Sequence, residues 1–481
     1  METSLTTPNN TPEGKNLFLL LLSEEGRKNA NAWITNHLPG IAPTPESWTG
    51  KDAKNFHLTA DLNVFFAGLG SKPTIENIRR AVAVGVAKCN ELKMDELSIV
   101  FSGVENENTW TAITEAAHLA NYQFNLYKTK PNINSLKSAT MITHPKKMAK
   151  AIQKGTVRAE ATSICRDLVN EPVITLTAPE FSNRMVQLGK TYGFQVEVFN
   201  KAKIQSLKMG GLLAVNFGSE IPPTFTILEY KGRGAKNKKP IVLIGKGVVY
   251  DTGGLSLKET AGSMDYMKSD MAGAGAVVGA FCGIASLKLP VHVIGLIPAT
   301  DNRPGKNAYV PGDVITMFDG TTVEVMNTDA EGRLILADAL GYAKKYAPEL
   351  VIDLATLTGA AVIAVGHQGT AMFAKTNDKI KKTLKTAGDN VHERLVEFPL
   401  WEEYRDQIKS DIADLKNVGG KPAGSITAAK FLEHFTDYPW IHLDIAGPSF
   451  IPSMDSYRGK NATGVGVRML IEFIDNYVHG L

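Results

Sequence analysis

The sequence predicts an α/β protein of two domains: a smaller N-terminal α/β domain (residues 1–160) and a larger C-terminal domain (residues 161–481) with a mostly parallel central sheet flanked by helices. The 481 residues exceed what one hydrophobic core usually organises. Strand-like and helix-like segments alternate along the whole chain. In the second part the strand-like segments are apolar on both faces, which is typical of parallel strands covered by helices on each side.

The first 140 residues or so alternate short strand-like runs with two helix-like segments, Thr74–Lys88 and Thr109–Ala120. The predicted strands are Leu17–Leu22, Val64–Ala67, Leu97–Phe101 and Phe124–Leu126. The first of these runs is too short for the core of a signal peptide, so a buried strand is expected there. A long amphipathic stretch, His144–Val169, predicts a connecting helix. It ends before Pro172, because proline disfavours helix in the residue before it.

The C-terminal part has longer and more apolar strand-like segments. The predicted strands are Pro240–Tyr250, Val291–Pro298, Thr322–Met326, Leu350–Leu354 and Trp440–Ile445. Helices are predicted between them, notably Met271–Ser286 and Leu334–Tyr346; in the second, apolar residues recur on a single stripe. Ligands of such sheets bind beyond the carboxyl ends of the strands, which is where the unusual polar residues of this sequence lie.

Composition limits the kinds of partner. The 52 basic and 49 acidic side chains leave a formal charge of only +3, which disfavours nucleic acid or an anionic membrane as the main partner. Three cysteines, Cys89, Cys165 and Cys282, are far apart in the sequence, which argues against a disulfide framework or a cysteine-built metal site. No stretch is expected to approach the length of a membrane span. A cytoplasmic protein is predicted.

A first cluster of charge follows a strongly apolar segment. Lys246 and Asp251 close the strand Pro240–Tyr250, and two glycines follow them. An isolated pair of this kind is most often a salt bridge. Both charges are expected where the strand is buried, however, and burying charge without compensation costs several kcal/mol. A bound metal ion would supply that compensation, and its charge would favour a neutral, coordinating lysine amine.

Two further clusters carry carboxylates. Asp270 directly precedes a helix of small residues, and taken alone it is best explained as a helix N-cap. In the third cluster an extended backbone would put Asp329, Glu331 and Arg333 on one side, ahead of a helix that starts at Leu334. Two carboxylates and a guanidinium at a helix N-terminus can bind cations and a small anion together, whereas the simpler alternative is a capping cluster with a salt bridge.

Four carboxylates and one amine, from Asp251, Asp270, Asp329, Glu331 and Lys246, form an oxygen-rich set of candidate ligands. The sequence has no H-E-x-x-H motif, which disfavours a histidine-based zinc hydrolase. Hard carboxylate oxygens suit two divalent ions, Zn²⁺, Mn²⁺ or Mg²⁺, without choosing among them. Two such ions close together would share and activate one water molecule.

With these residues in view, the chain resembles the leucyl (cytosol) aminopeptidase family. The octapeptide Asn327-Thr-Asp-Ala-Glu-Gly-Arg-Leu334 reads as the signature of that family and is highly specific. Further matching segments, in the family's order and spacing, are Gly245–Gly254, Leu354–Ala360, Gly424–Ala428, His442–Gly447 and Ala462–Gly466. The resemblance covers roughly Leu168 to Arg468, and the family's macro-like N-terminal α/β domain is compatible with the first part of the chain.

The resemblance implies a homohexameric enzyme that removes N-terminal, leucine-like residues from peptides by means of two divalent metals and a bridging hydroxide. One metal would be held by Lys246, Asp251, Asp270 and Glu331, and a more exchangeable one by Asp251, Asp329 and Glu331. Lys258 would polarise the scissile carbonyl, and Arg333 would hold a bicarbonate ion as general base. The implied substrate-binding residues are Met267, Asn327, Ala330, Thr356, Leu357, Gly359 and Ala446. The loop Glu259–Ser263 is one residue longer than in typical members, which bears on the pose of Lys258.

Two other functions use similar features. A two-metal phosphoesterase would share the carboxylates, but there is no P-loop motif, since Gly247 and not serine or threonine follows Lys246. A non-catalytic, DNA-binding oligomer is disfavoured by the near-neutral net charge, because DNA affinity depends on neutralising phosphates.

Overall fold

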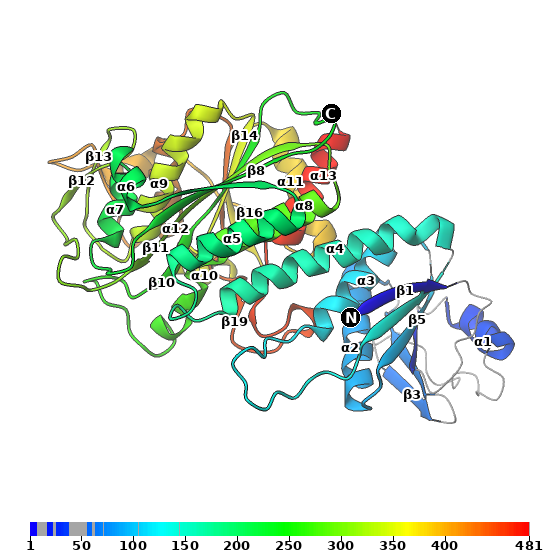
Figure 1. Cartoon of the computed structure of the whole chain (residues 1–481). Coiled ribbons are helices and arrows are strands. Elements are labelled where there is room, and N and C mark those ends of the chain that lie inside the picture. Colours follow the sequence, from blue (N-terminus) through cyan, green and yellow to red (C-terminus); the bar gives the residue numbers. More distant parts are fainter. Residues whose placement is uncertain are drawn as a thin grey trace. The chain divides into compact units, whose positions relative to one another are not determined.

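In the computed structural model the chain divides into two compact units (Figure 1). The first comprises Met1–Glu160 and Ser453–Gly459, and the second Ala161–Pro452 and Lys460–Leu481. The segment Ser453–Gly459 therefore groups with the N-terminal unit, although it lies in the range predicted for the C-terminal domain. The structure describes residues 1–6, 17–22, 26–37, 55–59, 63–70, 72–103, 105–143 and 145–480.

The N-terminal unit is a mostly parallel sheet with helices. Its elements are β1 (Glu2–Thr6), β2 (Leu17–Leu22), α1 (Gly26–His37), β3 (Asn55–Thr59), β4 (Asn63–Gly68), α2 (Ile75–Glu91), β5 (Glu96–Ser102), α3 (Glu107–Asn121) and β6 (Ser138–Ile142). The strand order is β1-β6-β5-β2-β4-β3, and only the β3–β4 pair is antiparallel. α2 packs against α3. A parallel sheet of this kind confirms the predicted α/β class.

The two predicted helices of this unit are confirmed, and each has a side-chain cap. Thr74 caps α2 by accepting a hydrogen bond from the backbone N–H of Asn77, and Asn106 caps α3 in the same way. The predicted strand Phe124–Leu126 is wrong, because the segment is a turn in which Leu126 is 64% exposed. A short apolar run with exposed side chains has no partner strand to bury them. The side chains of β2 lie outside what the structure describes.

The connecting helix is also confirmed. α4 runs over Pro145–Asn170 and ends just before Glu171 and Pro172, as the proline predicts. The predicted first residue, His144, lies outside the described residues.

The second unit contains a nine-stranded sheet, a three-stranded sheet and a two-stranded sheet. Its strands are β7 (Gln195–Phe199), β8 (Thr224–Lys231), β9 (Ile241–Gly245), β10 (Gly247–Asp251), β11 (His292–Asn302), β12 (Val314–Thr316), β13 (Thr322–Glu324), β14 (Leu350–Ala355), β15 (Thr370–Lys375), β16 (Leu395–Glu397), β17 (Leu415–Lys416), β18 (Trp440–Asp444), β19 (Phe450–Ile451) and β20 (Asn461–Ala462). Its α-helices are α5 (Ala178–Tyr192), α6 (Lys201–Ser206), α7 (Gly210–Asn216), α8 (Ala272–Ser286), α9 (Glu331–Ala343), α10 (Gly359–Val365), α11 (Asp378–Val391), α12 (Gly424–His434) and α13 (Val467–His479).

The large sheet has a parallel centre and mixed edges. The order is β16-β15-β18-β14-β9-β11-β8-β7, and β10 also pairs with β11. The central strands β18, β14, β9 and β11 are parallel to one another, whereas β15 pairs antiparallel with β18 and β8 pairs antiparallel with both β11 and β7. The carboxyl ends of the central strands therefore meet at one edge of the sheet.

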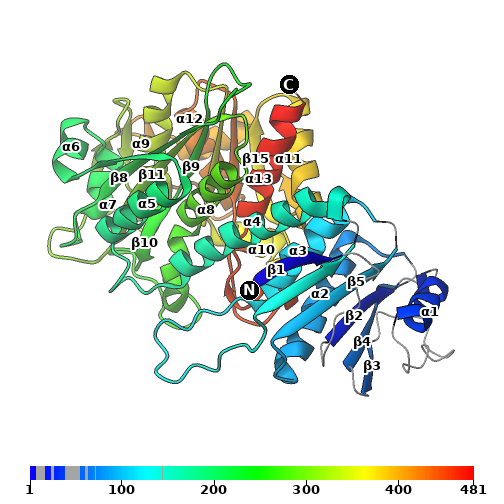
Figure 2. The ribbon, with the colours of Figure 1, turned by 45° about the vertical axis from the view of Figure 1, so that its right-hand side comes forward.

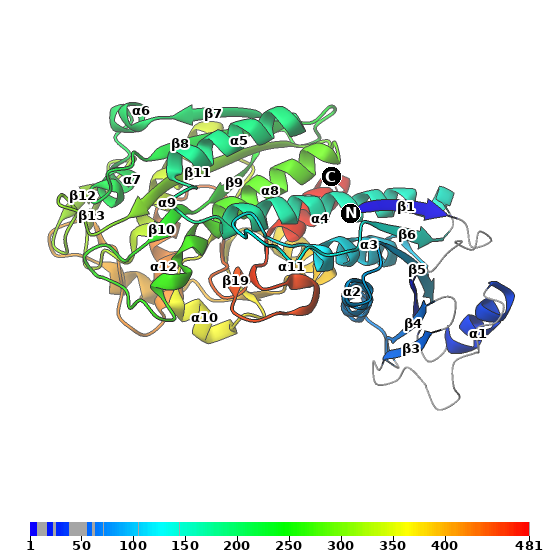
Figure 3. The same cartoon turned by 60° about the horizontal axis from the view of Figure 1, so that its bottom comes forward.

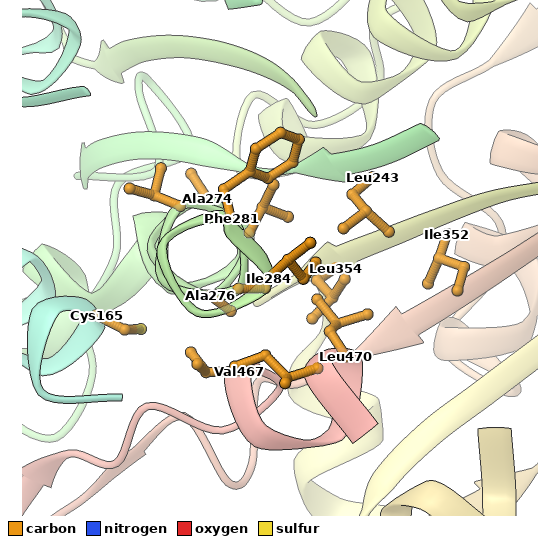
Figure 4. Close-up of a cluster of buried hydrophobic side chains, with 14 of the residues drawn as sticks. Cys165, Leu243, Ala274, Ala276, Phe281, Ile284, Ile352, Leu354, Val467 and Leu470 are labelled. Carbon is orange, nitrogen blue, oxygen red and sulfur yellow. The ribbon is translucent and has the colours of Figure 1, made fainter. Parts of the chain in front are cut away.

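Both faces of this sheet are buried, as the apolar strands predict. In β9, Ile241 and Leu243 contribute to the core under α5, α8, α11 and α13, while Val242 and Ile244 contribute to the core under α7, α9 and α12 (Figures 2 and 3). Figure 4 shows the first core, where Phe281 and Ile284 of α8 lie among residues from β9, β14 and α13. Successive side chains of a strand therefore point to opposite faces of the sheet and pack into two different cores.

The predicted strand Pro240–Tyr250 is broken at Lys246. The backbone N–H of Lys246 still donates to Leu354 O in β14 at 3.0 Å, but its carbonyl accepts a hydrogen bond from Ala274 N in the first turn of α8 at 3.0 Å. The carbonyl therefore leaves the sheet ladder to satisfy a free N–H at the helix N-terminus.

Two other predictions for this unit need correction. The predicted strand Thr322–Met326 is β13 of a separate three-stranded sheet with β12 and β17, not part of the large sheet. The predicted helix Leu334–Tyr346 begins earlier, at Glu331, because glycine at 332 is accommodated in its first turn and an acidic residue suits a helix N-terminus.

One stretch among the described residues is long and apolar enough to cross a membrane, contrary to prediction. This stretch, Met264–Ser286, consists of a 3-10 turn followed by α8, and 94% of its most apolar window is buried inside the protein. Its apolar residues face the hydrophobic core of the second unit, so it is accounted for as a core helix.

Candidate active site

A cavity of about 320 Å³ opens where the central strands of the second unit end. Lys246 and Thr356 follow the ends of β9 and β14, Asp251 ends β10, and Ala446 follows β18. Every residue that the sequence assigns to the site lines this cavity, namely Lys246, Asp251, Lys258, Met267, Asp270, Asn327, Asp329, Ala330, Glu331, Arg333, Thr356, Leu357, Gly359 and Ala446. Five separate segments of the chain thus converge on one site.

Lys246 is the most deeply buried cation of the site. Its side chain is 3% exposed, and Nζ lies 2.8 Å from Asp270 Oδ2 and 2.9 Å from Glu331 Oε1. Nζ also donates a hydrogen bond to the backbone oxygen of Thr356 at 2.8 Å. Burial alone lowers the pKa of this amine, but the carboxylates of Asp270 and Glu331 outweigh it and raise the pKa above its ordinary value.

Lys258 is the second cation and bridges two other carboxylates. Its Nζ lies 2.9 Å from Asp251 Oδ2 and also pairs with Asp329 Oδ1. Asp251 Oδ1 accepts hydrogen bonds from Gly253 N and from Asn302 Nδ2, each at 2.8 Å, so the carboxylate has one fixed oxygen and one that faces the lysine.

The carboxylates are electrostatically crowded. Burial raises the pKa of Asp251 to about 7, with a further contribution from Glu331, and burial also raises the pKa of Asp270 well above its ordinary value. Burial acts on Glu331 in the same direction, but Lys246 and Lys258 outweigh it and lower the pKa of that carboxyl. Within this cluster additional positive charge is therefore favourable.

The residues present fit divalent metal ions. Carboxylate oxygens of Asp251, Asp329 and Glu331 lie within 4.8 Å of one another. Glu331 Oε2 is buried without a hydrogen-bond partner among the described residues, which is costly unless another group binds it. The amine of Lys246 contacts one of these carboxylates, that of Glu331, and also contacts the carboxylate of Asp270. Hard oxygen donors of this kind are the ligands that Mg²⁺, Mn²⁺ and, with nitrogen, Zn²⁺ accept in proteins.

Two local predictions at the site are wrong. Asp270 is not a helix N-cap, because α8 begins after Met271 and the Asp270 side chain instead bonds Lys246 and the hydroxyl of Thr356. Asp329 and Glu331 do not alternate along an extended backbone, because Glu331 is already the first residue of α9. The helix start nevertheless brings both carboxylates to the same cavity.

Arg333 is buried and lines the same cavity as the carboxylates. Its Nη1 donates to the backbone oxygen of Asn417 at 2.7 Å, while Nε is buried with no hydrogen-bond partner among the described residues. Burial lowers the pKa of the guanidinium to about 10. The unpartnered donor leaves Arg333 able to bind a small anion.

Comparison with known proteins identifies the family. Residues 163–471 match the catalytic domain of the cytosol aminopeptidase family, and residues 54–131 match its N-terminal domain. The chain is 46% identical over 453 residues to a probable cytosol aminopeptidase of Chloroherpeton thalassium, covering 88% of each protein. The chain belongs to the cytosol aminopeptidase family. A probable cytosol aminopeptidase of Chlorobium limicola is 44% identical over 435 residues, covering 85% of each protein.

A solved structure supports the same assignment. The bottromycin maturation enzyme BotP in complex with Mn is similar with a TM-score of 0.86 and 32% identity, covering 96% of this chain and 100% of that one. Membership of the cytosol aminopeptidase family supports peptide-bond hydrolysis as the activity of this aminopeptidase. In this chain, the cluster of Asp251, Asp329 and Glu331 has the composition of a metal-binding group.

Several residues of the site have no counterpart among the sequence predictions. Asn302, Thr328, Asn417 and Asp444 each bond backbone or side-chain groups beside the cavity and are themselves buried. Thr328 lies inside the signature octapeptide and Asp444 inside the matching segment His442–Gly447, and those segments are the signals that could have drawn attention to them. Lys268 donates to the backbone oxygen of Asn170 at 2.8 Å.

Two histidines and one cysteine of the second unit make structural contacts. His442 is buried and shares a 2.6 Å hydrogen bond with Asp353 Oδ1, and His367 bonds the backbone oxygen of Gly447. Cys282 lies in the core of α8. None of these three residues lines the cavity.

Replacing Gly332 with alanine is expected to weaken metal binding about 10-fold to 100-fold. This range is typical of mutations that displace a group holding the metal ligands in place. A Cβ at this position would stand 2.4 Å from Lys246 Cε and 2.6 Å from its Nζ, so the buried amine must move. Titration of the purified variant with Mn²⁺, followed by calorimetry, measures the change. Gly341→Ala in the same helix, where the nearest atom would be 3.1 Å away, is the control. Equal affinities for Gly332→Ala and wild type would contradict the placement of Lys246.

Proposed function

We propose that this member of the family is a two-metal aminopeptidase that releases leucine-like residues from the N-termini of peptides in the cytoplasm, as a homohexamer. The observation that carries the proposal is the convergence of four carboxylates and two lysines on one cavity of about 320 Å³. Acidic side chains so close together are stabilised by bound dications, and the open cavity beside them admits a short peptide end.

The residues that would hold the ions are those that the family resemblance implies, and all of them line the cavity. Lys246, Asp251, Asp270 and Glu331 would hold one, and Asp251, Asp329 and Glu331 the other, so that two carboxylates are shared. Bound there, divalent ions lower the pKa of a water molecule and polarise a carbonyl group. Zn²⁺ and Mn²⁺ are the expected ions, with Mg²⁺ as a further candidate.

The rest of the cavity suits an apolar N-terminal side chain. Met267, Leu357 and Ala446 line it, together with Val362 and Val418, which the sequence did not single out. Thr356 and Gly359 complete this side, and Asn327 and Ala330 lie at the ligand-bearing turn. An apolar wall next to charged groups favours a substrate with a free amine and a leucine-sized side chain.

Two residues would act on the reacting groups. Lys258, held between Asp251 and Asp329, would donate a hydrogen bond to the carbonyl oxygen as negative charge develops on it. The buried donor Nε of Arg333 supports binding of bicarbonate, which would accept a proton and pass it to the leaving amine. Turnover in carbonate-free buffer is then expected to rise when bicarbonate is added.

Three substrates test the proposal. Leu-p-nitroanilide should be hydrolysed, whereas its N-acetylated form should not, because the blocked nitrogen no longer presents a free amine. p-Nitrophenyl phosphate should be inert. Hydrolysis of the phosphate ester without hydrolysis of Leu-p-nitroanilide would favour the phosphoesterase alternative and overturn the proposed function.

A further inference from the structure

We propose that the side-chain hydroxyl of Thr328 is a positioning device that sets where Lys258 stands relative to the carboxylates. This inference rests on the proposed function, in which Lys258 acts on the scissile carbonyl. Thr328 itself does not line the cavity, so its role would be exerted through the loop that carries the lysine.

Thr328 is fully buried, and its polar groups bond the loop that leads to Lys258. Its Oγ1 donates to the backbone oxygen of Gly253 at 2.6 Å and accepts from the backbone N–H of Ser256 at 2.8 Å. The relation with Ser256 is reciprocal, because the backbone N–H of Thr328 donates to Ser256 Oγ at 3.2 Å. Paired bonds of this kind fix the two segments in register with each other.

The loop is shaped to approach Thr328 closely. Gly253 and Gly254 adopt φ angles of +84° and +63°, which glycine adopts without strain. A Cβ at Gly254 would stand 3.0 Å from Thr328 Oγ1, so the backbone passes directly over the hydroxyl. The loop then closes, since the backbone N–H of Lys258 donates to Thr252 O at 2.9 Å. The backbone position of Lys258 therefore depends on the hydrogen bonds that the loop makes with the hydroxyl of Thr328.

The other side of Thr328 is anchored to the sheet. Its backbone oxygen accepts from Asn302 Nδ2 at 3.0 Å and from the hydroxyl of Tyr309 at 2.8 Å. Asn302 lies at the end of β11 and also donates to Asp251 Oδ1 at 2.8 Å. Thr328 thus joins the sheet, the loop of Lys258 and the ligand-bearing turn at Asp329.

This arrangement also bears on the loop Glu259–Ser263 after Lys258, which the family resemblance implies to be one residue longer than usual. Residues Glu259–Gly262 are exposed, whereas the loop before the lysine is tied to buried Thr328. The residues that restrain Lys258 are therefore those that precede it in the sequence. An extra residue in the exposed loop leaves that restraint intact.

The test compares Thr328→Val, which keeps the shape but removes the hydroxyl, with Thr328→Ser, which keeps the hydroxyl. With Leu-p-nitroanilide, the valine variant is expected to lose about 10-fold to 100-fold in kcat with KM within about twofold of wild type, and the serine variant to recover most of the loss. Bound metal, measured by atomic emission, should stay at the wild-type amount. Thr226→Val, which removes a buried hydroxyl bonded to Ser182 in the same unit, is the matched control.

The deciding step repeats Thr328→Val in a Lys258→Met background. If the hydroxyl acts through Lys258, the second change should have little further effect on the residual rate, because the group that it positions is already absent. An equal fold-loss in both backgrounds would overturn the inference and indicate a general structural role. So would unchanged kcat in Thr328→Val of an active wild-type enzyme. Absence of activity in the wild type would instead overturn the proposed function.

Discussion

Replacing Glu331 with glutamine is expected to lower kcat for Leu-p-nitroanilide about a thousandfold, because metal polarisation contributes several kcal/mol at about 1.4 kcal/mol for each factor of ten. Glu331 is buried, one of its oxygens faces Lys246 at 2.9 Å, and the other has no hydrogen-bond partner among the described residues. It is also a shared ligand in both proposed metal sites. The amide keeps the volume but removes the charge that binds the ions.

Metal binding, followed by its effect on thermal stability, gives the second measurement on this variant. Wild-type protein should gain thermal stability as Mn²⁺ is added, since a ligand that binds only the folded state stabilises it, and Glu331→Gln should gain much less. Glu349→Gln changes a carboxylate that bonds the hydroxyl of Tyr477 and does not line the cavity, so it serves as the control. Full activity in Glu331→Gln would refute its assignment as a ligand.

Replacing Lys258 with methionine is expected to lower kcat about 100-fold to 1000-fold, the usual loss when one preorganised donor to a developing oxyanion is removed. KM should change little, because the hydrogen bond strengthens mainly in the transition state. Methionine keeps much of the length and apolar stem of lysine but carries no charge or donor. Steady-state kinetics with Leu-p-nitroanilide separates the two parameters.

The same variant separates catalysis from structure. Loss of the ammonium removes the cation that pairs with Asp251 and Asp329. Bound dications then become the main charge compensation for these two carboxylates, so metal content should be retained. Lys375→Met, whose amine donates to the backbone oxygen of Thr436 on another part of the unit, is the control. A rise in KM at unchanged kcat would assign Lys258 to substrate binding and not to the chemical step.

Much of the fold could be predicted from the sequence because its signals are local. Runs that are apolar on both faces predicted β9, β11, β14 and β18, and the proline at 172 predicted the end of α4. The break at Lys246 was not predictable, because it depends on an N–H of α8 that is distant in sequence. β13 forms in a separate sheet for the same kind of reason: its partners β12 and β17 are set by tertiary structure.

The candidate site divides in the same way. The residues of the octapeptide and the lysine–aspartate segment could be selected from the sequence, because charges there follow apolar strands. Asn302 could not, since a neutral side chain that bonds distant groups leaves no pattern in its own neighbourhood. Thr328 lies inside the octapeptide, but nothing in the local sequence indicates that its hydroxyl bonds a distant loop. Taken alone, Asp270 fits the local pattern of a helix cap, and only its combination with the other carboxylates made it a candidate ligand; in the structure Lys246 and Thr356 bind its side chain.

The central claim is that Asp251, Asp270, Asp329, Glu331 and Lys246 together bind two divalent ions on which peptide hydrolysis depends. Its most direct test is titration of chelator-treated protein with Mn²⁺ or Zn²⁺ while bound metal and Leu-p-nitroanilide hydrolysis are measured in the same samples. We predict no turnover at the start, saturation at two ions per chain, and recovery of activity as the ions bind. Full turnover by protein shown to hold no metal would contradict the claim.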